Sequence, residues 1–312
     1  MSFEQALIVS ENYAGLRAQA LGLAERAGLR TLIRPLVPKS PWKHLPPRLW
    51  PNPLQATAFG AIPDGDLIIG CGGAAGAVGA KLHQRGLRVV QVQNPRIDPR
   101  QFDLVIVNHH DELNGPNVLV TRTALHGVTQ AKLRAAKAAW SPKFLHMRRP
   151  LVAALVGGSN GRLRFGEGEA AELAFKLALM MRQFKVSLVV TPSRRTGDKQ
   201  IAILRRALEP LGGYVWDMQG ENPYLGFLAM ADAIVVTMDS ISMISEACAT
   251  HAPVLVQPLP GKSRRIGLFV QMLEREKRIR MFETKYETWD VEPIDDTDWA
   301  ATEMLRRLEG TR

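Results

Sequence analysis

The stretch Ala233–Glu246, AIVVTMDSISMISE, decides the fold because it passes from a strand to a helix through a short polar turn. Its first residues, AIVVT, are apolar and mostly β-branched, which is typical of a strand buried on both faces. After the turn at Asp239, the spacing of Ile241, Ile244 and Cys248 predicts a helix whose apolar stripe packs on a sheet. A strand followed directly by a helix is the repeating unit of an α/β fold with a parallel sheet.

The same alternation of short apolar strands and helices runs through both halves of the chain. In the second half we expect strands at 151–156, 186–191, 214–216, 233–237 and 253–257, and helices at 167–183, 198–208, 223–230, 240–250 and 268–276. In the first half we expect strands at 5–10, 31–36, 66–70, 88–93, 103–107 and 117–121, and helices at 16–27, 74–85 and 129–140. This alternation predicts parallel sheets that helices cover on both faces.

A break in the alternation divides the chain. Residues 141–150, SPKFLHMRRP, carry two prolines and several cations, and 312 residues suffice for about two domains of roughly 150 residues each. We therefore predict an α/β protein of two Rossmann-like domains, whose mostly parallel sheets face each other across a cleft. The N-terminal domain is expected to cover 1–145 and the C-terminal domain 146–280. A tail at 281–312, with one helix, is expected to pack back on the N-terminal domain.

The charge balance favours an anionic partner. Forty Lys and Arg residues against 30 Asp and Glu give a formal net charge of +10, which suits nucleotides, phosphates or an acidic membrane face. Only 6% of the residues are aromatic, and the cations are not interleaved with Phe or Tyr. A stacking platform for nucleic acid is therefore not expected.

Cysteine usage and the N-terminus bear on the compartment. Cys71 and Cys248 lie far apart in apolar segments, so we expect buried, reduced thiols. No CxxC or HExxH spacing indicates a metal site. The start MSFEQALIVSENYAG is too short and too acidic for a signal peptide, and no apolar run approaches about 18 residues. We expect a cytoplasmic protein that is at most peripheral to the inner membrane.

The turn after the strand at 233–237 is the strongest candidate site, because open α/β sheets bind ligands at the carboxyl ends of their strands. A helix N-terminus at Asp239 and Ser240 would offer amides and the positive end of the helix dipole to a phosphate. Ser242 and Glu246 share a helix face, and Glu246 lies about 9 Å along the axis from Ser240. That spacing suits a diphosphate at the helix start with a ribose beside the carboxylate. The alternative is that Asp239 or Ser240 only caps the helix and that Glu246 is solvated.

Two further carboxyl-end loops carry groups that suit a nucleotide sugar. They are Gly157, Gly158 and Ser159 after the strand at 151–156, and Ser193, Arg194 and Arg195 after the strand at 186–191. Glycines let the backbone approach a ligand closely, and arginine forks suit phosphate oxygens. A tight turn with positive φ would require the same glycines, and a solvated basic loop is the alternative for the arginines.

The first half offers candidate catalytic groups at its own strand ends. His110 and Asp111 follow the strand at 103–107 and form a candidate general-base pair, since His titrates near neutral pH. His126 precedes the domain boundary, so we expect it to face the cleft. A structural histidine at a strand end is the alternative reading.

Taken together, these segments resemble the mitochondrial-fission Elm-type family. The matching stretches are AGLRAQALGLAE (14–25), VVQVQNPRIDPRQFDLVIV (89–107), HDELNGPNVLVT (110–121), GGS (157–159), TPSRRT (191–196), VWDMQGENPYLGFLAMADAIVVTMDSISMISEACA (215–249) and QPLPGKSRR (257–265). They follow the family's order and span nearly the whole chain. Two loops depart from the family pattern, SENYAG at 10–15 and SNGRLRF at 159–165.

The Elm-type family is similar in turn to GT-B glycosyltransferases and UDP-sugar epimerases, above all to the peptidoglycan enzyme that adds GlcNAc to a lipid-linked acceptor. This likeness implies that the turn at 239–242 lies at the diphosphate of the donor and that Glu246 holds the ribose hydroxyls. The plant members imply another role, at the mitochondrial surface, where they recruit a dynamin-related fission protein. One fold can therefore serve as an enzyme or as an adaptor.

We accordingly predict a GT-B-like protein that binds a UDP-type nucleotide sugar and acts as a metal-independent, inverting glycosyltransferase without a further cofactor. A non-catalytic adaptor is the first alternative. It would reach a protein partner or an anionic membrane surface through the loop Trp42–Trp50 and the cations Lys262, Arg264 and Arg265. An epimerase- or hydrolase-like enzyme with acidic residues at 111–112 in proton transfer is the second alternative.

Overall fold

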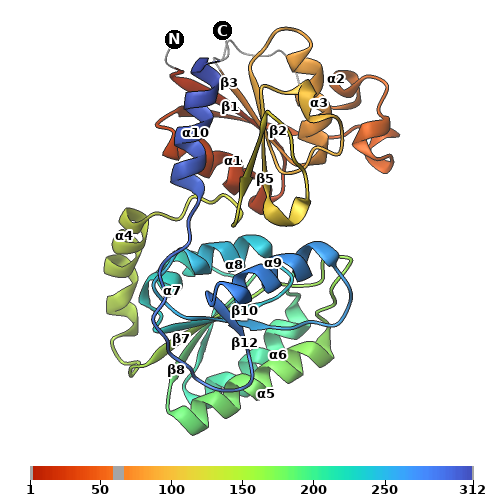
Figure 1. Ribbon diagram of the computed structural model, residues 1–312. Coiled ribbons are helices and arrows are strands. Elements are labelled where there is room, and N and C mark those ends of the chain that lie inside the picture. The colour runs from red at the N-terminus through yellow and green to blue at the C-terminus, as the bar shows by residue number, and fades with distance from the viewer. Residues whose placement is uncertain (1–2, 59–66, 311–312) are drawn as a thin grey trace. The chain divides into compact units, whose positions relative to one another are not determined.

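A computed structural model describes residues 3–58 and 67–310, which form two compact α/β units (Figure 1). Unit 1 consists of Met1–Gly127 and Asp295–Arg312, and unit 2 is the continuous segment Val128–Ile294. Each unit contains one six-stranded sheet in which all paired strands run parallel. The predicted fold class of two Rossmann-like domains is therefore confirmed.

The sheet of unit 1 has the strand order β2-β1-β3-β4-β5-β6. Its strands are β1 (Gln5–Glu11), β2 (Arg30–Leu36), β3 (Leu67–Cys71), β4 (Val89–Val92), β5 (Leu104–Asn108) and β6 (Val118–Thr121). Its helices are α1 (Ala14–Arg26), α2 (Pro53–Ala56), α3 (Gly73–His83) and α10 (Thr297–Gly310), with the short 3-10 turns η1 (Trp42–His44), η2 (Pro47–Leu49), η3 (Pro99–Gln101) and η4 (His109–Asp111). One core lies between the sheet and the helices α1 and α10, and a second core lies under α2 and α3.

The sheet of unit 2 has the order β12-β11-β10-β7-β8-β9. Its strands are β7 (Leu151–Val156), β8 (Ser187–Pro192), β9 (Tyr214–Val215), β10 (Ala233–Thr237), β11 (Val254–Gln257) and β12 (Ile279–Met281). Its helices are α4 (Gln130–Trp140), α5 (Glu167–Phe184), α6 (Asp198–Leu208), α7 (Tyr224–Met230), α8 (Ile241–Cys248) and α9 (Arg264–Arg275), with the 3-10 turns η5 (Ser141–Phe144) and η6 (Glu209–Leu211).

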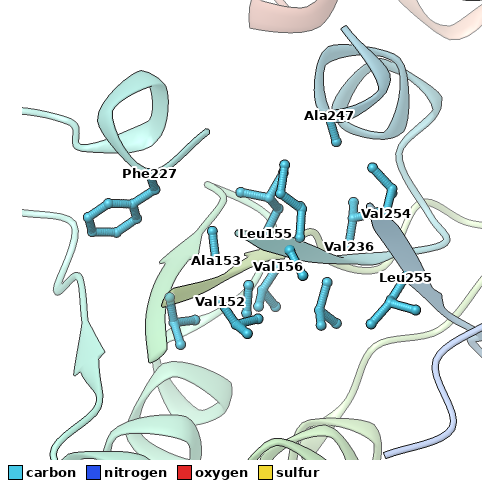
Figure 2. Close-up of a cluster of buried hydrophobic side chains, with 14 of the residues drawn as sticks. Val152, Ala153, Leu155, Val156, Phe227, Val236, Ala247, Val254 and Leu255 are labelled. Carbon is cyan, nitrogen blue, oxygen red and sulfur yellow. The ribbon is translucent and has the colours of Figure 1, made fainter. Parts of the chain in front are cut away.

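The central strands of unit 2 are apolar on both faces because helices cover both sides of the sheet. Every residue of β7, β10 and β11 is buried. Figure 2 shows this core, in which strand side chains meet Phe227 from α7 and Ala247 from α8. The loops that begin at the carboxyl ends of these strands carry the candidate site.

The division between the units falls earlier than the break in the sequence pattern. We expected the boundary at 145/146, whereas the compact units divide after Gly127. Helix α4 packs against α7 of unit 2, and Trp140 lies so close to Gly226 that a Cβ there would be 2.4 Å from Cγ of Trp140. The prolines of 141–150 therefore connect two elements of unit 2.

The C-terminal segment is shared between the units. Strand β12, which the sequence did not suggest, extends the sheet of unit 2 beside β11, and the chain stays in unit 2 as far as Ile294. Beyond that point α10 lies along α1 in unit 1 (Figure 1). The expected tail at 281–312 is thus divided near Asp295, and only its helical part packs on the N-terminal unit.

Candidate functional site

Three loops converge at the carboxyl edge of the sheet of unit 2. Strands β10, β7 and β8 are neighbours in the sheet, and each ends in one of the loops that the sequence singled out. Because parallel strands end at the same edge, residues 157–159, 193–196 and 238–240 come together there.

Asp239 lies at the centre of these loops, and its carboxylate is fully engaged by the protein. One oxygen, Oδ2, accepts hydrogen bonds from the Gly158 amide at 3.0 Å and from Nη2 of Arg195 at 2.8 Å. The other oxygen accepts the hydroxyl of Thr237 at 2.7 Å. The Asp239 residue is only 5% exposed. Asp239 therefore joins the three loops. That the turn Asp239–Ser242 lies beside a diphosphate stays a prediction.

Gly157 and Gly158 are required by protein contacts. Neither residue has a positive φ, so the tight-turn explanation is wrong. A Cβ at Gly157 would lie 2.1 Å from Oδ2 of Asp239, and a Cβ at Gly158 would lie 1.9 Å from the carbonyl oxygen of Arg195. The missing side chains let Asp239 and Arg195 come close, and the loop backbone is fixed as a result.

Arg195 belongs to this cluster and still reaches solvent. Its side chain is 41% exposed, and Nη1 donates to the Gly158 carbonyl at 3.0 Å. Its backbone amide donates to Oγ of Ser193 at 3.2 Å, and the Thr196 hydroxyl donates to the Gly157 carbonyl at 2.6 Å. Arg194 next to it is exposed. The loop after β8 thus presents one fixed and one solvated guanidinium at the carboxyl edge.

The polar residues of the loops after β10 and β7 have local structural partners. Ser240 caps α8, since its Oγ accepts the Met243 amide at 3.3 Å. Ser159 holds the following loop, because its Oγ accepts the Phe165 amide at 2.9 Å. Asn160, which we had not placed among the site residues, donates from Nδ2 to the Asp239 carbonyl at 2.9 Å. Ser240 thus caps the helix, as the alternative interpretation allowed for Asp239 or Ser240, and Ser242 lies half-buried in the first turn.

Glu246 is half-buried in the second turn of α8, so the interpretation of it as a solvated residue is wrong. The hydroxyl of Tyr224, at the start of α7, donates a hydrogen bond to Oε2 of Glu246. Burial raises the pKa of Glu246 to about 7, and the hydrogen bond from Tyr224 acts in the opposite direction. Tyr224 could not be recognised from sequence spacing, because it and Glu246 lie on different helices.

The loop after β11 is tied to the loop after β7. Gly261, at φ 125°, forms an isolated antiparallel bridge with Leu163, and a Cβ on it would lie 2.1 Å from the Arg162 carbonyl oxygen. The amide of Lys262 donates to that same carbonyl at 3.2 Å. Lys262 is therefore held beside the loop of residues 157–165, while Arg264 is exposed at the start of α9.

The candidate catalytic groups of unit 1 occupy neighbouring strand ends. His110 lies in η4 after β5, and His126 lies in the loop after β6. The two loops are joined by Asn108, whose Nδ2 donates to Oγ1 of Thr121 at 2.9 Å. His110 is 3% exposed and His126 is 1% exposed. Two such buried imidazoles fit the structural interpretation better than contact with an acceptor, and their catalytic role stays a prediction.

Contacts of the acidic residues in unit 1 complete this picture. Nε2 of His126 lies 3.5 Å from Oδ1 of Asp295, and Oδ2 of Asp111 accepts the Asn108 amide at 3.3 Å. Glu11, at the end of β1, is half-buried and accepts a hydrogen bond from the Ala74 amide, and burial raises its pKa. Glu11 was not among the candidates from the sequence, although it directly follows a predicted strand.

Two negative findings apply to residues 3–58 and 67–310. None of the helices there is long and apolar enough to span a bilayer. No group of three or more His, Cys, Asp or Glu side chains in these ranges is arranged to hold a metal ion. Cys71 and Cys248 are both buried free thiols, as expected, and burial raises the pKa of each.

Comparisons with known proteins place the chain in a family. The family described as Mitochondrial fission ELM1 matches residues 14–308. The Arabidopsis thaliana protein named Mitochondrial fission protein ELM1 is 33% identical over 279 residues, which are 78% of this chain and 64% of the plant protein. The chain thus spans a little under two thirds of that relative.

Solved structures show the fold. MurG of Acinetobacter baumannii has a TM-score of 0.52 at 15% identity, covering 98% of this chain and 91% of its own. The UDP-GlcNAc 2-epimerase of Neisseria meningitidis, with bound UDP-GlcNAc, has a TM-score of 0.54 at 14% identity, covering 97% of this chain and 100% of its own. Both have the GT-B fold, as predicted. The chain belongs to the Mitochondrial fission ELM1 family.

Proposed function

We propose that the protein binds a UDP-type nucleotide sugar at the carboxyl edge of unit 2 and transfers the sugar to an acceptor without a metal ion. The observation that carries this proposal is the Asp239 cluster, which fixes three loops and leaves the guanidinium of Arg195 partly exposed beside the start of α8. A preorganised cationic edge at a helix N-terminus suits a diphosphate. The Neisseria neighbour, which holds UDP-GlcNAc, supports the choice of ligand class.

The donor is assigned to groups that face this edge. Arg194, Arg195 and the first-turn amides of α8 neutralise the diphosphate, with the backbone of 157–159 alongside. Glu246 accepts hydrogen bonds from the ribose hydroxyls. Asp239 keeps the loops in place without touching the ligand.

The reaction is a displacement at the anomeric carbon. An acceptor hydroxyl oxygen forms the new bond to that carbon, the bond to the diphosphate oxygen breaks, and UDP leaves with the electron pair. The acceptor proton passes to a general base, and the assignment of His110 with Asp111, or of His126, to that role stays a prediction. The arginines and the dipole of α8 stabilise the charge that develops on the departing diphosphate.

Calorimetric titration with UDP and UDP-GlcNAc tests the donor site. We expect binding by the wild-type chain and a loss of at least roughly tenfold in Glu246→Ala, because a hydrogen bond to a charged group is worth about 1.5–3 kcal/mol. Glu209→Ala is the matched control, since Glu209 is exposed beyond the end of α6 and away from the carboxyl edge. Absence of UDP binding in the wild-type chain would contradict the proposal.

A second candidate function, docking on an anionic membrane surface, is favoured by the segment 37–49, here called the basic loop. It exposes three large apolar side chains, Val37 (56%), Leu45 (42%) and Leu49 (59%). It also carries the exposed cations Lys39, Lys43 and Arg48, and no Asp or Glu lies between residues 26 and 58. Apolar side chains surrounded by cations suit the headgroup region of an anionic bilayer.

Hydrogen bonds from Trp50 and Ala58 hold the basic loop. Trp50 is buried, and its indole N–H donates to the carbonyls of Trp42 at 2.9 Å and Leu45 at 3.2 Å. At the other end, the Ala58 amide donates to the Val37 carbonyl at 3.0 Å. A loop fixed in this way loses little conformational freedom on binding.

Vesicle co-sedimentation tests the docking. We expect binding to vesicles that contain phosphatidylglycerol, not to pure phosphatidylcholine, and weakening by salt because the attraction is screened. The triple variant Lys39→Glu/Lys43→Glu/Arg48→Glu should lose binding, whereas Arg134→Glu/Lys137→Glu on the exposed face of α4 should keep it. Equal binding by both variants would exclude the basic loop, and capture of an acidic protein without any vesicle binding would favour an adaptor for proteins.

A further inference from the structure

We propose that Tyr224 is a positioning residue for Glu246: its hydroxyl holds one oxygen of the carboxylate and thereby directs the other to a hydroxyl of the ligand. The inference rests on the proposed function, because it takes Glu246 as the group that binds the ribose. The observation behind it is the hydrogen bond from the Tyr224 hydroxyl to Oε2, between two half-buried side chains of different helices.

Helix α7, which carries Tyr224, is held in place by packing. Phe227, one turn further on, is fully buried and packs edge-on against Phe144 and Trp140, with ring centroids 5.4 and 6.4 Å apart. Gly226 lies directly against the Trp140 side chain, and the Tyr224 amide donates to Oδ1 of Asn222 at 3.0 Å. The phenol therefore approaches α8 from a rigid base.

Helix α8 is equally fixed at both ends. Ser240 caps its start, and the buried guanidinium of Arg278 donates to the carbonyl of its last residue, Cys248, at 3.0 Å and to that of Thr250, just beyond the end, at 2.7 Å. With the backbone held, the main freedom of Glu246 lies in its side-chain torsions. Tyr224 removes that freedom in the free protein, so binding need not remove it again.

Tyr224 also governs the protonation of Glu246. An ionised carboxylate carries no O–H and only accepts, which suits a ligand hydroxyl that donates, and a donated hydrogen bond favours the ionised form. Burial has the opposite effect and raises the pKa of Glu246 to about 7. The ionised fraction, and with it ligand binding, should increase as the pH rises through about 7. Loss of the Tyr224 hydroxyl should move this midpoint upwards.

The other charged groups that the structure describes around α8 do not contact the Glu246 carboxylate. The Arg195–Asp239 pair precedes the helix, and Arg278 binds carbonyls at its far end. His251 is exposed after the helix, and the strands β10 and β11, which pack on it, contribute no ionisable side chain. In the described part of the chain, Tyr224 is the one side chain that shifts the pKa of Glu246.

The first test needs no ligand. The ¹³C resonance of the Glu246 carboxylate, assigned by its absence in Glu246→Gln, is followed against pH in the wild-type chain and in Tyr224→Phe. We expect a midpoint near 7 in the wild-type chain and a higher one in the variant. Tyr214→Phe is the matched control, because the ring of Tyr214 packs on Phe144 and Phe227. An unchanged midpoint in Tyr224→Phe would overturn the inference.

The second test measures UDP affinity between pH 6 and pH 9. If the midpoint rises by one unit, Tyr224→Phe should bind roughly fivefold more weakly at pH 7 and recover most of the loss at pH 9. Glu246→Gln should lose the pH dependence. If the wild-type chain binds no UDP while the carboxylate midpoint still shifts in Tyr224→Phe, the proposed function fails and the positioning contact stands. If UDP binds and Tyr224→Phe follows the wild-type chain at every pH, the positioning role fails alone.

Discussion

The Asp239 carboxylate lies where three chain segments meet, and each segment supplies it with one hydrogen-bond donor. The Gly158 amide, the Thr237 hydroxyl and the Arg195 guanidinium all point at its two oxygens. A buried carboxylate is costly unless it is paired and hydrogen-bonded in this way. The geometry of the carboxyl edge therefore depends on the charge of one residue that need not touch the ligand.

Asp239→Asn tests that dependence at nearly constant volume. The amide cannot accept on both sides as the carboxylate does, and its own N–H₂ would face donors, so we expect about 1–3 kcal/mol lower stability in urea unfolding. UDP affinity should fall as well, because the Gly158 and Arg195 loops would lose their common anchor. Asp290→Asn, at an exposed position, should change the unfolding free energy by no more than about 0.5 kcal/mol. Equal stabilities of the two variants would contradict the anchoring role.

Gly158 offers a second test at the same scale, through sterics instead of charge. In Gly158→Ala the new methyl group would meet the Arg195 carbonyl at 1.9 Å, and forced overpacking of this kind costs about 1–3 kcal/mol. A Cβ at Gly168 on α5 would have no neighbouring atom within 4 Å. Gly168→Ala should therefore raise the free energy of unfolding by about 0.4–1 kcal/mol. Thermal unfolding of the pair should therefore shift in opposite directions. A Gly158→Ala protein as stable as the wild type would show that the loop can yield.

What a single residue does could be predicted where the cause is local. The cap at Ser240 was foreseeable because a cap and its amide partner are three residues apart, and the actual contact is the one expected. Glu246 was placed on the correct helix, but its burial and its partner Tyr224 follow from the packing of α7 beside α8. No spacing within a sequence encodes such a contact between side chains of different helices.

Elements were predictable to the extent that their burial pattern is visible in the sequence. The central strands appear as continuous apolar runs, and the structure places them within a few residues of the expected ranges. Strand β12 is a short edge strand with one buried residue, so it carries no such run. Helix α4 was predicted, but its unit was not, because the face that packs on α7 is recognisable only once Trp140 meets Gly226.

Helix α8 yields a prediction at the scale of an element, because Arg278 satisfies the carbonyls at its end. Arg278 is only 2% exposed, and burial lowers the pKa of its guanidinium. Arg278→Met keeps most of the volume but leaves the carbonyls of Thr250 and Ala252 without these donors, while the Cys248 carbonyl keeps the Ile294 amide at 2.8 Å. Each buried acceptor without a partner costs about 1–3 kcal/mol.

Urea unfolding measures this cost, and amide hydrogen exchange along α8 shows whether the helix frays from its end. Arg275→Met, which replaces an exposed arginine in the last turn of α9, is the control and should leave both measurements nearly unchanged. Full protection of the α8 amides in Arg278→Met would mean that the guanidinium does not hold the helix.

At the scale of the whole molecule, the two units differ in how the chain builds them. Unit 2 is one continuous segment, whereas unit 1 takes its last helix from the far end of the chain. Several ion pairs fix the returning segment to the rest of unit 1, among them Arg26 with Asp295 at 2.8 Å and Arg122 with Asp296 at 2.6 Å. The sequence predicted a helix that packs back, but it could not show that the segment before this helix stays in unit 2.

Truncation after Ile294 tests this construction. Helix α10 contributes four buried side chains, Ala300, Ala301, Met304 and Leu308, to the core that it shares with α1. Exposing one large apolar side chain costs about 1.5–3 kcal/mol, and a whole domain is stable by only about 5–15 kcal/mol. The truncated chain should therefore lose the cooperative unfolding transition of unit 1 in calorimetry. The unfolding transition of unit 2 and the affinity for UDP should persist, because every group assigned to the donor lies between Val128 and Ile294. Trp299→Ala, at a residue that is 51% exposed, should leave both transitions in place, whereas Met304→Ala should lower that of unit 1 alone. If truncation instead abolished both transitions together, the two units would fold as one cooperative body, and the assignment of the donor site to a self-sufficient unit 2 would have to be given up.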